Sequence, residues 1–284
     1  MKIRRFLAKL PIGPLRRLPP VVGVVRLGGV IGGIGPLRRG LTLATVERAL
    51  ERAFNLDGVE AVALAVNSPG GSPVQSALIF RRVRALAAET GVRVFAFAED
   101  VAASGGYWLA LAGDEIYADE SSIIGSIGVI SSGFGFDQAI ERLGIERRLH
   151  TAGDKKSMLD PFRPEDPDDI ARLEEIQGDV HQSFKQAVRE RRGAKLAAGD
   201  EETVFSGAFW AGRRAVELGL IDGVGDLRSV MRARYGDDVK LKPVGDERAW
   251  FRRRFRLAGP APADWASDLL WAIETRAWWS RYGL

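Results

Sequence analysis

Segments of strand character alternate with segments of helix character over the first hundred residues of this chain. Residues 21–27 and 59–66 are rich in valine, leucine and alanine, and residues 93–98 alternate between larger and smaller side chains, as strands do. Between them, residues 43–54 and 74–90 have the composition and length of helices. Strands and helices in this order predict an α/β fold with a largely parallel sheet and right-handed crossovers.

The pattern continues with shorter segments and one long amphipathic helix. We expect strands at residues 115–118, 123–131 and 146–150, helices at 137–143 and 166–192, and closing segments at 209–218, 227–235 and a strand near 239–244. The long helix carries one apolar stripe from Ile170 to Val188. We therefore assign residues 21–245 to one domain, with a basic arm at residues 1–20 and a tryptophan- and arginine-rich helical tail at residues 246–284.

Composition narrows the classes of function. The chain has 284 residues, of which 46% are hydrophobic, enough for a large buried core. Its net charge of +4 is small for this length and does not indicate a nucleic-acid partner. The absence of cysteine excludes a disulfide framework, a thiolate zinc site and a thiol nucleophile. We expect neither a metal nor a cofactor.

The ends of the sequence bear on its location. No uncharged apolar run approaches 18 residues, and the basic N-terminus lacks the hydrophobic stretch of a secretory signal. We therefore expect a cytoplasmic protein, with peripheral membrane contact as an option. Five of the seven tryptophans lie in the tail among arginines. This composition fits an interfacial membrane helix, a helix that packs on a neighbouring subunit, or a C-terminal core helix.

The sequence Val101-Ala-Ala-Ser-Gly-Gly-Tyr-Trp-Leu-Ala110 places one hydroxyl group between a strand and a helix. Ser104 would lie at the end of the sheet, and Gly105 and Gly106 would leave room for a ligand. Amide groups at the start of the helix would point toward a developing negative charge. Ser104 is therefore a candidate nucleophile, and the alternative is a serine that only caps the helix.

A second glycine pair follows the preceding strand, in Ala65-Val-Asn-Ser-Pro-Gly-Gly-Ser72. Gly70 and Gly71 permit a sharp turn that exposes amide hydrogens, as an oxyanion hole requires. The alternative is a simple proline-glycine turn. Because the carboxyl ends of parallel strands lie at one edge of a sheet, Gly70 and Ser104 can meet there.

A serine nucleophile needs a base that takes its proton. The chain has two histidines. His181 falls on the long amphipathic helix, where packing or surface exposure is favoured, and His150 follows a predicted strand and remains a candidate. A lysine can serve if burial lowers its pKa by roughly three units. Lys156, followed by apolar residues, is better placed for burial than Lys155, although either fits a solvated loop charge.

Four motifs occur in a fixed order along the chain: Asn67-Ser-Pro-Gly-Gly71, Ala103-Ser-Gly-Gly-Tyr107, Gly125-Ser-Ile-Gly-Val129, and a Thr-Ala-Gly sequence ahead of Lys156. In this order they resemble the signal peptide peptidase A family, which includes the SohB-like proteins. The resemblance extends roughly from residue 21 to residue 244. Members of that family commonly carry an N-terminal membrane anchor, whereas this sequence has only a basic arm there.

The resemblance implies a ClpP/crotonase-like fold, a spiral of ββα units, and a serine-lysine peptidase. By position, Ser104 matches the nucleophile, Lys156 the general base, and the amides of Gly70 and Gly105 the oxyanion hole. Ser126 matches a serine that hydrogen-bonds the lysine amine, with a polar core residue inside a strand as the alternative. The resemblance also implies a ring-like homo-oligomer in which neighbouring subunits can complete the active site.

The leading hypothesis is a serine endopeptidase that cleaves apolar, membrane-derived or signal-peptide-like peptides. A crotonase-type acyl-CoA enzyme is the first alternative, since it would use the same two amides on an enolate but needs no serine nucleophile. The second is a non-catalytic, membrane-associated scaffold. The presence of Ser104, Lys156 and Ser126 together argues against the scaffold.

Overall fold

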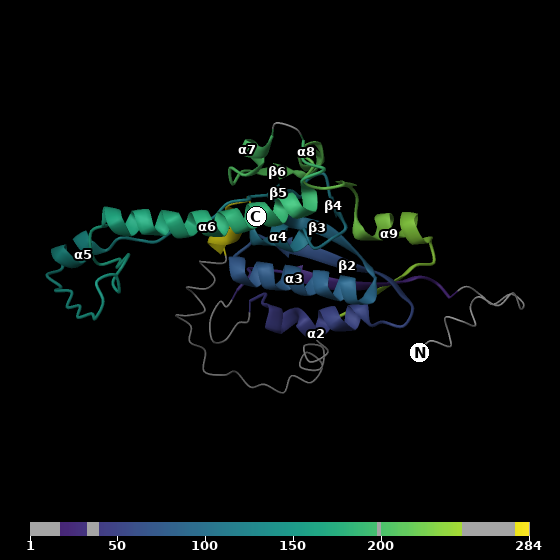
Figure 1. Cartoon of the computed structure of the whole chain (residues 1–284), viewed down its shortest axis with the longest axis horizontal. Helices are drawn as coiled ribbons and strands as arrows, with labels where there is room; N and C mark the ends of the chain where they lie inside the picture. The colour runs from purple at the N-terminus through teal and green to yellow at the C-terminus, as the bar shows by residue number, and fades with distance from the viewer. Residues whose placement is uncertain (1–17, 33–39, 198–199, 246–275, 284) are drawn as a thin grey trace, which may run out of the picture.

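One sheet of eight strands is built by the residues that this computed structural model describes, which are 18–32, 40–197, 200–245 and 276–283 (Figure 1). Most of the predicted basic arm and tail lies outside these residues. The strands are β1 (Val21–Gly28), β2 (Val59–Ser68), β3 (Arg93–Ala103), β4 (Glu115–Ala118), β5 (Ile123–Gly125), β6 (Phe209–Ala211), β7 (Gly223–Val224) and β8 (Lys240–Pro243). The helices are α2 (Leu43–Phe54), α3 (Pro73–Thr90), α4 (Gly105–Ala110), α5 (Asp137–Arg142), α6 (Pro167–Arg192), α7 (Glu201–Val204), α8 (Gly212–Glu217) and α9 (Leu227–Tyr235).

The sheet is parallel except at one edge. Its strand order is β6-β5-β3-β2-β1-β8, with β4 paired to β3 and β7. Only the pairing of β5 with β6 is antiparallel among the described strand pairs. β3 pairs with β4 over residues 95–98 and with β5 over residues 101–103. This topology confirms the predicted α/β class and agrees with the spiral that the resemblance implies.

Buried aliphatic side chains on both faces of the central strands hold the layers together. On one face, helices α2 and α3 bury Leu50 and Ile79, each 0% exposed, against β1 and β2. On the other face, α9 packs Met231 against Phe95 and Phe97 of β3. Burying each such aliphatic side chain stabilises the fold by about 1.5–3 kcal/mol. The central strands are therefore fixed, and so are the loops at their carboxyl ends.

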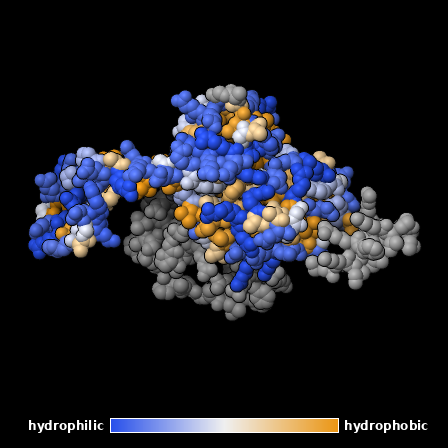
Figure 2. All heavy atoms as spheres, viewed as in Figure 1, coloured by the Kyte–Doolittle hydropathy of each residue, from blue (hydrophilic) through white to orange (hydrophobic). Residues whose placement is uncertain are grey.

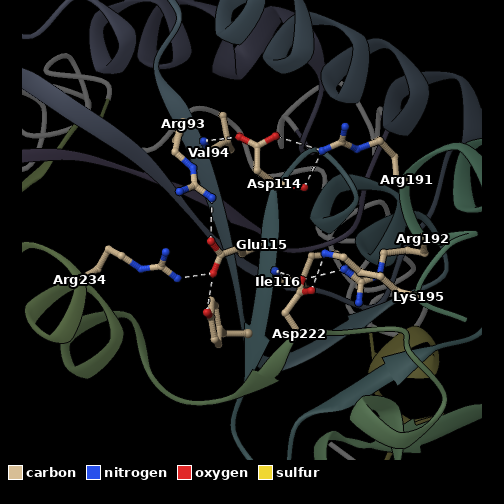
Figure 3. Close-up of polar contacts among 12 residues, drawn as sticks. Arg93, Val94, Asp114, Glu115, Ile116, Arg191, Arg192, Lys195, Asp222 and Arg234 are labelled. Atoms are coloured by element: carbon tan, nitrogen blue, oxygen red, sulfur yellow. Dashed lines mark hydrogen bonds and ion pairs between the residues drawn. The ribbon is translucent and has the colours of Figure 1, made fainter.

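Ion pairs connect the elements around β4, and Figure 3 shows those that Asp114 forms with Arg191 and those of Glu115 and Asp222. Three carboxylates lie on or beside this strand, and each bonds two basic side chains: Asp114 with Arg84 and Arg191, Glu115 with Arg93 and Arg234, Asp222 with Arg192 and Lys195. Asp222 also accepts a 2.8 Å hydrogen bond from the Ile116 amide. The carboxyl end of α6 is thereby pinned to the sheet.

The opposite half of α6 leaves the body of the molecule with the segment that precedes it (Figure 1, left). Along the predicted apolar stripe, Phe184 and Val188 are buried, but Ile176 is 45% exposed. We call residues 129–166 the projecting arm; in Figure 2 it is largely hydrophilic with separate apolar side chains. The strand predicted at residues 146–150 is wrong, because this exposed segment has no partner strand.

Candidate active site

Ser104 lies between β3 and α4 in a backbone conformation that is rare for a residue with a side chain. Its φ is 52° and its ψ −124°, a strain of about 1–3 kcal/mol. Its amide donates to the Gly125 carbonyl at 2.8 Å, and its carbonyl accepts from the Trp108 amide at 3.1 Å. The side chain makes no helix-capping hydrogen bond. The simple capping role is therefore not observed, and Ser104, which is partly exposed as a residue, lies at the end of the sheet.

The glycine loop after β2 lies directly beside Ser104. Gly70 and Gly71 have φ values of 106° and 136°, which favour glycine. A Cβ atom on Gly70 would lie 2.8 Å from the Ser104 Cβ and 3.0 Å from the Gly105 nitrogen. The predicted meeting of Gly70 and Ser104 at one sheet edge is therefore observed, and only glycine fits at that approach.

The two amides proposed for an oxyanion hole differ in their present bonding. Gly105 is the first residue of α4, and amides in a first helical turn have no intrahelical partner. The Gly70 amide instead donates to the Ser68 Oγ at 3.2 Å. Ser68, 0% exposed, itself donates to the Gly29 carbonyl at 2.7 Å. Sequence reasoning missed this role of Ser68, although its place at the end of a strand in the glycine-loop motif was a usable signal.

Ser126 lies at the same sheet edge, one residue beyond β5. It is 7% exposed and has a φ of 55°, and its amide donates to the Ala208 carbonyl at 2.7 Å. The predicted strand over residues 123–131 is wrong in its extent, since Gly125 and Ser126 both take positive φ values and end it. The alternative of a polar residue inside a strand therefore does not apply.

Neither candidate lysine is buried in the single chain. Both lie in the turn over residues 154–159 of the projecting arm and are exposed. The Lys155 Nζ lies 3.3 Å from a carboxylate oxygen of Asp169, and this bond raises the pKa of Lys155, which favours its charged form. The burial expected for Lys156 is not observed, because the arm carries it away from the sheet (Figure 1).

The histidines take other positions. His150 is exposed on the projecting arm. His181 is half-buried on α6, and its Nε2 lies 2.9 Å from the carbonyl oxygen of Ile127. Burial lowers the pKa of His181, against the opposing effect of that carbonyl. His181 therefore holds the loop that follows Ser126 and makes no bond to Ser104.

Over the described part of the chain, no group of three His, Asp or Glu side chains is placed to hold a metal ion. In the same residues every helix is too short or too polar to cross a bilayer. A serine with a strained backbone, a glycine backbone packed against its side chain and amides at a helix start are the elements of acyl-transfer chemistry. Together they define an α/β protein whose site is arranged for acyl transfer by a serine.

The profile of peptidase family S49 matches residues 87–241, more than half of the chain. The chain belongs to peptidase family S49. Two proteins that are similar in sequence to this chain carry the names SppA and SohB. These names agree with the predicted family resemblance.

Individual relatives match a large share of this chain. A Brucella abortus protein named Na(+)/H(+) antiporter NhaA is 49% identical over 290 residues, covering 96% of this chain and 39% of that protein. The chloroplastic serine protease SPPA of Arabidopsis thaliana is 30% identical over 226 residues, covering 78% of this chain and 33% of the protease. The chain thus spans well under half the length of these two relatives.

Among solved structures, a lysine mutant of the 1510-N membrane-bound stomatin-specific protease in complex with a substrate peptide is similar. Its TM-score is 0.49 at 15% identity, covering 90% of this chain and 98% of that one. The family assignment rests on the profile and on the sequence relatives.

Proposed function

We propose that this chain is a serine endopeptidase that cleaves extended, apolar, membrane-derived or signal-peptide-like peptides with Ser104 and Lys156. The observation that carries the proposal is the position of Ser104, strained at the sheet end, with the Gly70 backbone against its Cβ. The proposal follows the order of family motifs around these residues, and the family S49 match supports it.

In this mechanism the Ser104 Oγ attacks the peptide carbonyl carbon while the neutral Lys156 amine takes the hydroxyl proton. The oxyanion accepts hydrogen bonds from the Gly105 amide and from the Gly70 amide. The Gly70 amide must first give up its hydrogen bond to the Ser68 Oγ. The lysine then delivers its proton to the leaving amine, and an ester to Ser104 remains. Water, deprotonated by the same amine, hydrolyses that ester. Ser126 orients the amine through its hydroxyl.

Because Lys156 is exposed in one chain, we propose that the pair forms between neighbouring subunits. The projecting arm carries exposed apolar side chains, with Phe134 80% and Leu143 73% exposed, and the adjoining face of α6 exposes Ile176. The Phe134 ring also lies against the Phe136 ring, and Phe136 against Phe162, and an exposed apolar cluster of this kind marks a protein contact surface. In a ring-like homo-oligomer, this surface would pack on the next subunit, bring Lys156 to the neighbour's Ser104 and remove it from water. That burial would lower the pKa of the amine.

Peripheral contact with a membrane, on its cytoplasmic side, remains a further proposal. It rests on the basic and tryptophan-rich composition of the two ends of the chain. Co-sedimentation with anionic vesicles tests it directly. If the full-length protein does not sediment with the vesicles at low salt, this proposal is rejected.

Peptide hydrolysis and labelling by a fluorophosphonate test the peptidase proposal. We expect Ser104→Ala and Lys156→Ala to lose at least about 100-fold in turnover, and Ser104→Ala to lose labelling completely. The neighbouring variant Lys155→Ala is the matched control and should retain most activity. Equal turnover in all four proteins would reject the proposal, and an unlabelled but folded wild type would favour the crotonase-type alternative.

A mixing experiment tests the contribution of two subunits. Ser104→Ala and Lys156→Ala subunits are each inactive under the proposal, but a co-assembled mixture contains sites with an intact serine and an intact lysine. Activity that returns on co-assembly supports a pair formed between subunits. A mixture that stays inactive, from variants that assemble normally, would place both groups in one chain.

A further inference from the structure

The C-terminal segment of the chain, residues 276–283, returns to the sheet edge that holds Ser104. It forms a short helix followed by a turn (Figure 1, yellow). Tyr282 is only 8% exposed. A large aromatic side chain buried in so short a segment outside the sheet indicates a specific contact.

The Tyr282 hydroxyl bonds to two of the loops that surround Ser104. It donates to the Ser126 Oγ at 3.3 Å or to the Pro69 carbonyl oxygen at 3.4 Å. Pro69 precedes Gly70, whose Cα approaches the Ser104 side chain, and Ser126 follows Gly125, whose carbonyl accepts from the Ser104 amide. Both residues that the hydroxyl contacts, Pro69 and Ser126, are therefore adjacent in sequence to a residue that contacts Ser104.

The Tyr282 ring covers apolar side chains next to the same serine. It packs in one cluster with Val101 and Ala103 of β3, both 0% exposed, and Trp279 packs against this cluster. The Phe209 ring meets the Tyr282 ring edge to face, at 5.1 Å between centroids and an interplanar angle of 71°, a favourable aromatic geometry. We call these three neighbours, Val101, Ala103 and Phe209, the tyrosine surface.

We propose that the tyrosine surface is a substrate subsite for an aromatic side chain, and that the C-terminal segment occupies it in the resting enzyme. The inference rests on the proposed function. A peptide bound for attack by Ser104 must lie along this sheet edge, and Tyr282 already fills part of that edge. Its hydroxyl also lies 3.3 Å from the Ser126 Oγ as a donor, at the group that the mechanism assigns to the Lys156 amine. The segment must therefore withdraw before the catalytic pair forms.

The rate of fluorophosphonate labelling of Ser104 tests the inference in the full-length chain. Tyr282→Ala should be labelled about tenfold faster than wild type, which corresponds to a loss of about 1.4 kcal/mol in the free energy that holds the segment over Ser104. In peptide hydrolysis, the variant should lower KM more than it changes kcat. Trp278→Ala is the matched control, since Trp278 stacks on Arg281 outside the cluster, and should label like wild type. If Tyr282→Ala fails to fold, Tyr282→Phe takes its place in the experiment. This variant keeps the ring, so its labelling should be faster than that of wild type by a smaller factor.

A peptide with the sequence of residues 276–283 provides a second test. Added to Tyr282→Ala, it should inhibit competitively, whereas the same peptide with alanine in place of its tyrosine should not. Among substrates, those with an aromatic residue near the cleaved bond should be preferred, and Phe209→Ala should reduce that preference. Identical labelling rates in wild type, Tyr282→Ala and Tyr282→Phe would overturn this inference alone. Absence of any labelling at Ser104 in every variant would overturn the proposed function instead.

Discussion

The amide of Ser104 donates a 2.8 Å hydrogen bond to the carbonyl oxygen of Gly125. This bond joins the end of β3 to the residue before Ser126, so the two serines are fixed to each other through the backbone. Both have positive φ values, 52° and 55°, and each costs about 1–3 kcal/mol that the surrounding structure must offset. The strain is concentrated where the chemistry is proposed.

Gly70→Ala should remove activity while leaving a folded protein. The added Cβ would lie 2.8 Å from the Ser104 Cβ and would displace the serine or the loop. We expect a loss of at least about 100-fold in kcat, the size of effect of a lost oxyanion donor. Gly58→Ala is the control, because Gly58 also has positive φ but no atom within 4 Å of its added Cβ. It should cost about 1–2 kcal/mol of stability and little activity, as urea unfolding and peptide hydrolysis would measure. Similar kinetics in both variants would contradict the placement of Gly70.

His181 should titrate below its ordinary value of 6.5, since burial lowers its pKa. Its folded pKa then lies below the unfolded one, so its contribution to stability is present above about pH 6.5 and is lost as pH falls through the folded pKa. Proton NMR measures that pKa, and a His150→Gln variant assigns the two histidine signals. His181→Gln should flatten the stability profile between pH 7.5 and 5. A titration midpoint at or above 6.5 would refute this expectation.

Asp222→Asn should destabilise the fold by about 3–5 kcal/mol at pH 7, because it breaks a largely buried ion pair with Arg192 (Figure 3). Burial opposes ionisation of Asp222, but hydrogen bonds from Lys195, the Ile116 amide and Arg192 outweigh it and lower its pKa. The stabilisation is therefore present above pH 4 and is lost as pH falls through the folded pKa. Urea unfolding should show the difference from wild type shrinking below pH 4, whereas the exposed Asp237→Asn should differ little at any pH. A difference that does not change with pH would count against the ion pair as its source.

Ile176→Asp should disrupt assembly without unfolding the subunit. The side chain is 45% exposed in one chain, so a charge there costs little until a neighbouring subunit covers it. Light scattering should report a smaller species for Ile176→Asp than for wild type, with unchanged circular dichroism. Ala171→Asp, on an exposed position of α6 outside the apolar stripe, should assemble normally. Equal masses for the three proteins would mean that this face of α6 is not an interface.

Local sequence predicted most strands of the sheet and most of the helices, but it did not predict β7, and it placed a strand at residues 146–150 that the structure does not have. α2 begins at Leu43 and ends at Phe54 as expected, and α6 fills almost all of its predicted range, since apolar periodicity and capping residues act within a few positions. Ser104 and the glycine loop could also be found, because parallel strands place their carboxyl ends at one edge. Sequence alone gave no signal that Tyr282 would return to this edge.

The sequence by itself determined most of the strands and helices and which serine they present, because these depend on contacts between residues close along the chain. Tertiary structure alone decided that Ser126 lies outside the strand and that the Ser68 hydroxyl accepts a hydrogen bond from the Gly70 amide. It also decided that Lys156 is exposed in the single chain and that Tyr282 is buried. Each of these outcomes depends on atoms brought together from distant parts of the chain, where packing and hydrogen-bond geometry, and not local conformational preference, set the free energy.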